Sequence, residues 1–431
     1  MLNAASMKPL EDDRLGFSFT FMVVLLALML GGVFPAAVVL FSPTVVWLIW
    51  GVWWILIVDM ARRIPILPLL KPLRPLFLWM LAYIVWGTMA ATYPIFEESY
   101  RLAFRFGSVA IALAFMTASP RALNIFANAA QWVLLLNVIA IILLAIFPQY
   151  QTLSIFTTLN VEVDSDRFSG LWLNANQAGL VTLIILSFSH WATRWIKIMG
   201  RISGGVIIFL TASRTANFIT LGLIVLFILF KASRKVQFRA AMVAVTLFVG
   251  ASFYVQFSSL DVVSLASKSE ILMRVTDLSE SKARAAGDGS RVDLAKSWIP
   301  IIAAEPWYGY GLYTMNGGRS HEAGVRPGFP EHGPHNLYLG IIVDVGYLGL
   351  ISFLLIVAWQ LFRTFQAPID SATQWWLFVL PFVTLIFAVA NHNMVTDYPG
   401  WTAFSMIFLL PFNPAVRLGN PAPAHELAER D

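Results

Sequence analysis

Cysteine is absent from the 431 residues of the chain, which excludes disulfide bonds and metal sites built from thiolates. Charged residues are also few, at 12% of the composition, whereas 58% of the residues are hydrophobic. No soluble domain of this length needs so much apolar surface. The formal net charge of +5 is too small for this length to indicate a nucleic-acid partner. The composition therefore predicts a polytopic membrane protein.

Apolar runs of membrane-spanning length recur along the chain and mark the expected helices. They lie at about 17–34, 36–58, 75–92, 101–118, 124–147, 171–190, 203–213, 215–230, 240–257, 336–362, 373–391 and 398–413. Basic residues follow every even-numbered run, and positive charge collects on the cytoplasmic side of a membrane. We therefore predict an all-α fold with about 12 transmembrane helices and both termini in the cytoplasm. The seventh and twelfth runs are short.

The prediction divides the chain into four parts. Residues 1–257 would hold helices 1–9, 258–335 an external loop, 336–413 helices 10–12, and 414–431 a disordered cytoplasmic tail. The external loop mixes acidic and basic residues, which favours short amphipathic helices lying over the membrane face. A loop of this length between membrane helices is usually functional. The first residues are charged and the next apolar run is long enough to stay as a helix, so no cleavable signal peptide is expected.

His335 stands where the polar loop ends and the tenth apolar run begins. This position predicts a place in the first turn of a membrane helix, where backbone N–H groups and the helix dipole favour anions and a neutral imidazole. Gly346 and Gly349 then fall within about 20–40° of His335 on a helical wheel, so another helix could press close beneath it. Asp344 falls about 180° away and is not expected to orient His335. The alternative is that His335 only starts a helix and the glycines serve packing alone.

Two arginines on the external side could bind a phosphate group. Arg214 lies between the seventh and eighth runs, and a charge between two membrane spans is costly without an anionic partner. Arg291 lies in the external loop, and its planar guanidinium suits phosphate oxygens. Each also has a simpler interpretation, because Arg214 could extend to the membrane interface and Arg291 could pair with a neighbouring aspartate.

Further polar residues stand at the outer ends of predicted helices, namely Arg101, Arg105, Arg167, Asn174 and Asn176. The two asparagines open the sixth run, where amides can bind sugar hydroxyls but more often cap a helix. The first two arginines lie one helical turn apart. They could extend a basic site or, as we favour, pair with Glu97 and Glu98.

The sequence does not favour a metal site. Glu331, His332 and His335 are close together, but Gly333 and Pro334 prevent one helical face from presenting both histidines. We therefore predict that the protein uses neither a metal ion nor an organic cofactor.

The spacing of His335-Asn336, Gly346 and Gly349 resembles a signature of the O-antigen ligase / O-antigen polymerase family. Three further blocks resemble the family and stand in its order: Arg167-x-x-Gly170 with Asn174-x-Asn176, then Ser213-Arg214-Thr215, then Ser290-Arg291 followed by Pro306-x-x-Gly309-x-Gly311. The resemblance runs from the first of these blocks to Gly349, and the first five predicted helices contribute hydropathy alone.

This resemblance implies a GT-C-like fold in the bacterial inner membrane, with a metal-independent, inverting glycosyltransferase site that faces the periplasm. As in an O-antigen ligase, the donor would be a glycan on undecaprenyl diphosphate and the acceptor would be lipid A–core. A polymerase of O-antigen or exopolysaccharide repeats shares these blocks and stays open, as does an O-linked protein glycosylase. A lipid-linked glycan flippase would instead place charges at mid-membrane on several helices, whereas here only Asp344 lies deep.

The family's roles can be carried onto matching positions of this chain. They make His335, Arg214 and Arg291 catalytic: the arginines would offset the diphosphate charge, and His335 would take the acceptor's proton or bind phosphate. The residues expected to bind substrate are Arg167, Asn174, Asn176 and Asn336 from the family blocks, and Arg101 and Arg105 from their position alone. Membrane lipids are the remaining expected partner.

Overall fold

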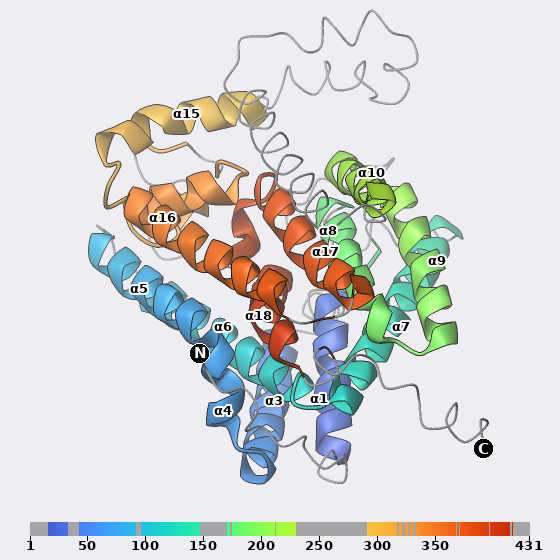
Figure 1. The fold of residues 1–431 in the computed structure, drawn as a ribbon. Coiled ribbons are helices and arrows are strands. Elements are labelled where there is room, and N and C mark those ends of the chain that lie inside the picture. Colours follow the sequence, from blue (N-terminus) through green and yellow to red (C-terminus); the bar gives the residue numbers. More distant parts are fainter. Residues whose placement is uncertain are drawn as a thin grey trace, which may run out of the picture.

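The computed structural model describes residues 16–32, 43–91, 96–146, 170–172, 175–211, 213–229, 291–316, 319–320, 324–325, 328–330, 333–367, 369, 371–395, 397–413 and 416. Within them the fold is helical apart from one short antiparallel hairpin (Figure 1), so the all-α prediction is confirmed. The hairpin joins β1 (Arg319–Ser320) to β2 (Gly324–Val325), with Arg319 opposite Val325.

Helices in the first part of the chain coincide with the first five apolar runs, apart from two short elements at 66–73 that lie between the second and third runs. They are α1 (Phe17–Leu30), α3 (Pro43–Arg63), α4 (Ile66–Leu70), the 3₁₀ turn η3 (Lys71–Leu73), α5 (Arg74–Ala90), α6 (Phe96–Met116) and α7 (Pro120–Ile146). A proline follows the first residue of both η3 and α5, a position that tolerates its missing N–H.

Most of the later elements coincide with six more of the predicted runs, whereas two elements at 291–304 and 314–316 lie within the predicted loop 258–335. They are α8 (Ala175–Ser187), η5 (Ser189–Trp191), α9 (Arg194–Thr211), α10 (Arg214–Leu229), α15 (Arg291–Ala304), η6 (Thr314–Asn316), α16 (Leu337–Gln366), α17 (Ser371–Ala388), η7 (His392–Val395), α18 (Tyr398–Leu409) and η8 (Leu410–Phe412). The ninth predicted run, at 240–257, lies outside the described residues, as do 258–290 and nearly all of the tail 414–431.

Four helices among the described residues are long and apolar enough to cross a membrane: Ile66–Ala90, Pro120–Leu143, Leu337–Gln366 and Thr373–Ala390. They support the membrane assignment, while the count of about 12 spans and the GT-C-like fold stay predictions. The seventh helix differs from its prediction, because α9 begins at Arg194 rather than near 203. Arginine and lysine are good helix formers whose charged ends can reach the membrane surface, so Lys197 and Arg201 belong to the helix instead of the connection before it.

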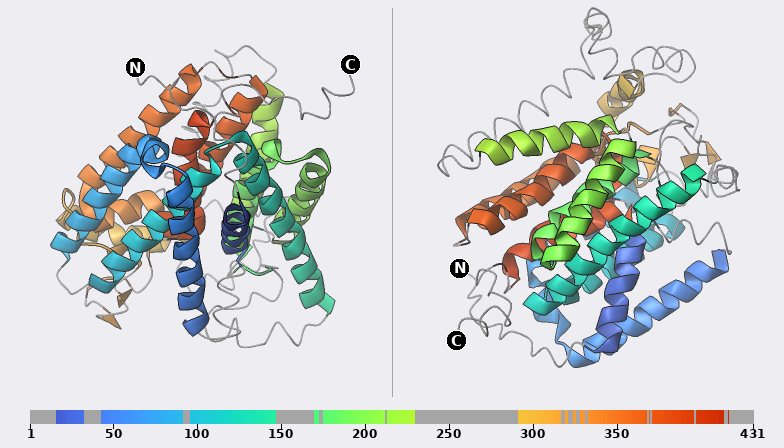
Figure 2. Two further views of the ribbon diagram at one scale, coloured as in Figure 1. Left: turned by 90° about the horizontal axis from the view of Figure 1, so that it is seen from below. Right: turned by 90° about the vertical axis from the view of Figure 1, so that its right-hand side faces the viewer.

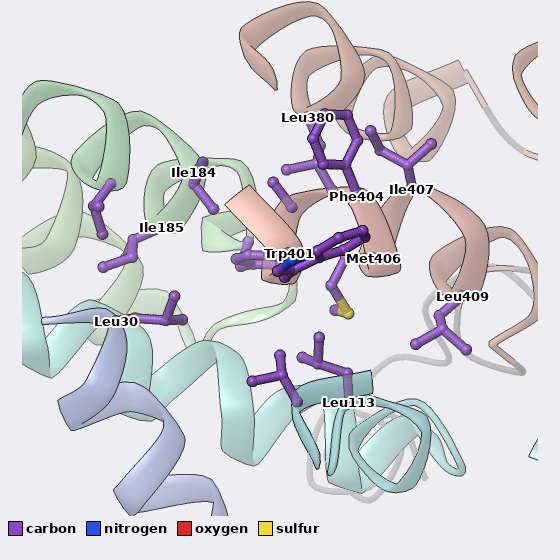
Figure 3. Packing of buried hydrophobic residues seen from close by; sticks show 14 of the residues in the cluster. Leu30, Leu113, Ile184, Ile185, Leu380, Trp401, Phe404, Met406, Ile407 and Leu409 are labelled. Atoms are coloured by element: carbon purple, nitrogen blue, oxygen red, sulfur yellow. The ribbon is translucent and has the colours of Figure 1, made fainter. Parts of the chain in front are cut away.

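The core is built around α18, which is buried from Pro399 through Leu409. Figure 3 shows Trp401, Phe404 and Met406 among apolar side chains of other helices. The Trp401 ring lies 4.3 Å, centroid to centroid, from Phe106 of α6. A helix this short is stable here because the surrounding helices enclose it, and tight van der Waals packing replaces contact with lipid.

Neighbouring helices are also tied together at their ends. In Figure 2, α7, α8 and α9 run side by side. The Trp172 Nε1–H donates to the Leu30 carbonyl at 2.8 Å, and the Leu171 N–H donates to the Asn137 side-chain oxygen at 3.0 Å. These bonds fix the short segment that precedes α8 against α1 and α7.

Candidate functional site

Helix α16 is broken at Gly346, whose φ of 75° and ψ of −178° are far from helical values. A side chain cannot be placed there, because a Cβ on Gly346 would lie only 2.1 Å from the Trp307 carbonyl oxygen. All residues from Leu337 to Gly346 are buried. A break in a membrane-spanning helix is tolerated only where other protein groups satisfy the freed backbone N–H and C=O groups.

The segment 305–312 supplies those groups. The Tyr347 N–H donates to the Pro306 carbonyl at 2.8 Å, the Tyr310 N–H to the Val343 carbonyl at 2.8 Å, and the Gly311 N–H to the Asp344 carbonyl at 2.9 Å. The Pro-x-x-Gly-x-Gly block therefore docks into the break of α16, and two blocks that are distant in the sequence form one unit. The expectation that another helix would press against Gly346 is wrong, since this loop occupies the space.

Asp344 lies at the centre of this unit and its side chain is fully buried. Its carboxylate accepts hydrogen bonds from the Tyr83 hydroxyl at 2.5 Å, the Met315 N–H at 2.7 Å and the Tyr313 N–H at 3.1 Å. Tyr83 belongs to α5, and the other two donors belong to the turn after the docked block. These partners agree with the expectation that Asp344 does not orient His335.

His335 lies outside the helix and not in its first turn, which corrects the prediction. The N-cap of α16 is Asn336, whose side-chain oxygen accepts the N–H groups of Tyr338 and Leu339 at 2.9 and 3.2 Å. His335 is half-buried and has a φ of 49°, a left-handed value that is uncommon for a residue other than glycine. The helical wheel drawn from His335 therefore does not apply, and Asn336 already satisfies two of the N–H groups expected to face an anion.

Helix α5 contacts α16 near Gly349, although the atoms nearest to a Cβ at Gly349 belong to Val345 and Ile341 of α16 itself. The Trp79 Nε1–H of α5 donates to the Gly349 carbonyl at 3.0 Å. The Trp79 ring also stacks on Tyr83, with 5.2 Å between ring centroids. Helix α5 thus contacts α16 on both sides of the break.

The N-termini of α8 and α10 form a second meeting point of predicted site residues. The Ser213 hydroxyl donates to the Asn176 side-chain oxygen at 3.2 Å and accepts the Ala216 N–H at 3.4 Å, so it caps α10. A Cβ on Gly179 would lie 2.7 Å from that of Ala216, which shows how closely the two helices approach. Arg214 is the first residue of α10, one position after the cap.

Four of the predicted side chains lie outside the described part of the structure: those of Arg167, Asn174, Arg214 and Arg291. Arg291 begins α15, the short helix that crosses one end of the molecule beside α16 in Figure 1. This helix agrees with the short helices expected in the external loop. Trp298 is fully buried and anchors α15 in an apolar cluster with Leu339 and Ile342 of α16.

Arg101 and Arg105 are half-buried on α6. The Arg105 guanidinium lies 5.7 Å from the centroid of the Tyr398 ring, at the start of α18. Burial raises the pKa of the neighbouring Asp397 carboxyl to about 6, and the positive charge of Arg105 opposes that rise. Arg105 thus has an electrostatic neighbour that sequence reasoning did not pair with it, while the side chains of Glu97 and Glu98 lie outside the described residues.

Among the described residues, no three His, Cys, Asp or Glu side chains gather as a metal site would require. Glu331 and His332 lie outside that part of the chain.

Comparison with known proteins bears directly on the unit formed by the segment 305–312 and the break in α16, called the docked unit below. Residues 199–354 match the O-antigen ligase family model. This stretch covers a little over a third of the chain and runs from α9 to the middle of α16. The resemblance to the O-antigen ligase family is therefore confirmed, and it supports a ligase- or polymerase-type glycosyl transfer in a membrane. No curated protein and no solved structure matches the chain.

The matched segment 199–354 contains His335, Arg214 and Arg291, and residues from outside the segment contact it. Tyr83 and Trp79 contact the broken helix from α5, and Asn176 contacts Ser213 from α8. Sequence reasoning missed both aromatic residues of α5. No local pattern distinguishes Tyr83 and Trp79 from the other apolar residues of this run. Each differs from them only by one polar side-chain atom, and the hydrogen-bond partner of that atom is far away in the sequence.

Proposed function

We propose that the protein is an O-antigen ligase that moves O-polysaccharide en bloc from undecaprenyl diphosphate to lipid A–core. The transfer would take place at the periplasmic face of the bacterial inner membrane. The observation that carries this proposal is the family match of residues 199–354, which includes both halves of the docked unit at Gly346. The four apolar helices of spanning length among the described residues suit an enzyme whose two substrates are lipid-linked.

In the proposed reaction, a hydroxyl of the acceptor attacks the anomeric carbon of the donor. The bond from that carbon to the diphosphate oxygen breaks, and undecaprenyl diphosphate leaves with the bonding electrons. His335, in its neutral form, accepts the proton of the attacking hydroxyl. Attack from the side opposite the leaving group inverts the anomeric centre.

The leaving group carries negative charge that must be offset for the bond to break. We assign this role to Arg214 and Arg291, because the planar fork of arginine matches phosphate oxygens and each residue begins a helix in a family-like block. Arg101, Arg105, Arg167, Asn174 and Asn176 would contact the glycan or the carrier. Asn336 would act mainly through its cap, which fixes the backbone next to His335.

The deciding experiment incubates the purified protein with a lipid-linked glycan and lipid A–core, with and without a chelator. Glycan attached to lipid A–core, equally in both samples, is the expected result and matches a metal-independent ligase. Longer glycan on the lipid carrier would identify a polymerase instead. Loss of product with the chelator contradicts the metal-independent mechanism, and the absence of any covalent product contradicts glycosyl transfer.

The proposed orientation places 258–335 in the periplasm and both termini in the cytoplasm. Because the native chain lacks cysteine, single cysteines at Ser281 and Ser320 give an unambiguous test. Both should react with an impermeant thiol reagent in cells whose outer membrane alone has been permeabilised. Labelling that requires lysis of the inner membrane would reverse the orientation.

A further inference from the structure

Asp344 is a buried acid that takes no part in the proposed chemistry. A buried carboxylate is costly unless hydrogen bonds compensate its lost hydration, and Asp344 accepts three of them. Two come from backbone N–H groups of the turn 313–315, and one comes from the hydroxyl of Tyr83. The carboxylate thus joins three pieces of chain: α16, α5 and the turn.

The turn 313–315 precedes the segment 316–335, which connects it to α16 and ends at His335. Its N-terminal side is held as well, because the Leu312 N–H donates to the Gly87 carbonyl of α5 at 2.8 Å. The C-terminal end of the segment 316–335 is fixed where Asn336 caps α16. Both ends of 316–335 are therefore anchored on the first ten residues of α16, one through Asp344 and the other through Asn336.

The backbone at the turn is held in an unfavourable conformation. Tyr313 has a φ of 64°, which is uncommon for a residue with a side chain. Such a conformation is strained and persists only where surrounding contacts impose it. The hydrogen bond from the Tyr313 N–H to Asp344 is one of those contacts.

We propose that Asp344, with Tyr83, is a positioning residue for glycosyl transfer, because it fixes the turn 313–315 and so the external segment that leads to His335. It acts through the loop and does not touch the substrate. The inference rests on the proposed function. A displacement of about 1 Å in a catalytic group can cost as much as 100-fold in rate, so the geometry of this anchor bears on turnover.

The test compares Tyr83→Phe with Tyr338→Phe in the reconstituted transfer assay. Each substitution removes one buried hydroxyl and keeps the ring, but the Tyr338 hydroxyl donates to the Leu385 carbonyl of α17 at 2.7 Å instead of serving the turn. We measure kcat, the KM for the donor, the unfolding midpoint, and amide hydrogen exchange in a peptide covering 309–316.

For Tyr83→Phe we expect kcat to fall about 10- to 100-fold with the donor KM within about twofold of the wild type. Exchange in 309–316 should accelerate, and the midpoint should fall no further than in Tyr338→Phe. Asp344→Asn should lower kcat more, since an amide places N–H donors against backbone N–H groups. The double variant Tyr83→Phe/Asp344→Asn should have nearly the same kcat as Asp344→Asn, because both changes remove hydrogen bonds of the same carboxylate.

Each contrary result has one meaning. An active wild type with equal kcat values in Tyr83→Phe and Tyr338→Phe contradicts the positioning role and leaves Tyr83 as a stabilising residue. Unchanged exchange in 309–316 contradicts it as well. If Asp344→Asn fails to fold, the Tyr83→Phe comparison still decides. A wild type that transfers no glycan overturns the proposed function itself, and this role with it.

Discussion

The two halves of α16 differ sharply, although both are apolar in sequence. From Leu337 to Gly346 every residue is buried, and this half contains a buried acid and ends in a broken turn. Beyond the break, the buried residues recur at helical spacing, and they are Phe353, Val357, Gln360 and Thr364. Large apolar side chains such as Leu354 and Leu355 are exposed between them.

This difference shows what each half is adapted to meet. The first half is enclosed by protein, so polar groups of the loop and of α5 can satisfy its irregular backbone. The second half presents a regular stripe to its neighbours and an apolar face outward, as a helix against lipid must. The chemistry we propose belongs at the enclosed end.

The largest expected effect follows from filling the break. In Gly346→Ala the new methyl group would collide with the Trp307 carbonyl, at a φ that alanine rarely adopts. We expect little folded protein by size-exclusion chromatography in detergent. Gly51→Ala is the matched control, because nothing lies within 4 Å of a Cβ there, and it should fold at least as well as the wild type. A folded and active Gly346→Ala would contradict the described docking.

His335→Ala should lower the turnover rate and leave the stability of the fold nearly unchanged. Loss of a general base costs about 10²–10⁴-fold in turnover, whereas a half-buried residue outside the helix contributes little to the unfolding midpoint. His335→Gly should be as inactive but slightly more stable than His335→Ala, since glycine accepts the φ of 49°. Near-normal transfer by either variant would return His335 to a purely structural role.

The same variants distinguish a base from a phosphate ligand. If His335 is the base, donor affinity should hardly change, and wild-type activity should fall with decreasing pH as the imidazole protonates. If a protonated His335 binds phosphate, donor affinity should weaken in His335→Ala.

Arg214→Lys and Arg291→Lys should each lower turnover by about tenfold or more, because a single ammonium does not replace a bidentate guanidinium on phosphate. Arg62→Lys, at the exposed end of α3, is the control and should retain full activity. Full activity in both site variants would remove the arginines from the mechanism. A structure with the two guanidinium groups more than about 15 Å apart would show that they cannot flank one diphosphate.

The smallest effect on activity is expected in the second half of α16. Phe353 is buried against Trp79 and Phe404, so Phe353→Ala should lower stability by about 3 kcal/mol with kcat nearly unchanged. Leu354→Ala, at an exposed neighbour, should change stability by less than about 0.5 kcal/mol. Denaturation midpoints and turnover of the two variants provide the measurement. A large loss of kcat in folded Phe353→Ala would extend the functional region past the break.

Hydropathy was sufficient to predict the helices, because an apolar run of this length has few other stable forms. Of the glycines Gly346 and Gly349 in α16, Gly346 correctly indicated a close approach by another segment. The sequence did not indicate that the segment approaching Gly346 is a loop, because hydrogen bonds between segments about 40 residues apart leave no local pattern. Tyr83 and Asp344 are 261 positions apart, and nothing near either residue predicts the other.

The start of α16 shows a different kind of miss. An asparagine just before an apolar run is a standard signal for a helix N-cap, and Asn336 has that role. Its assignment to substrate binding comes from the family resemblance. The start of the apolar run predicts that His335 lies in the first helical turn, whereas the cap at Asn336 leaves His335 just outside the helix. The basic residues at the start of α9 predict a connection between helices, because charge usually ends an apolar run, but they belong to the helix.

The enclosure of α18 also bears on how the protein is made. Phe106 and Trp401, in contact in the folded core, are separated by the synthesis of almost 300 residues, which takes roughly 15–60 s at ordinary translation rates. During that time the inward faces of α1, α6 and α8 have no α18 to pack against. The core therefore closes late, and substitutions in α18 should reduce the amount of protein that accumulates in the membrane more than the turnover of each finished molecule.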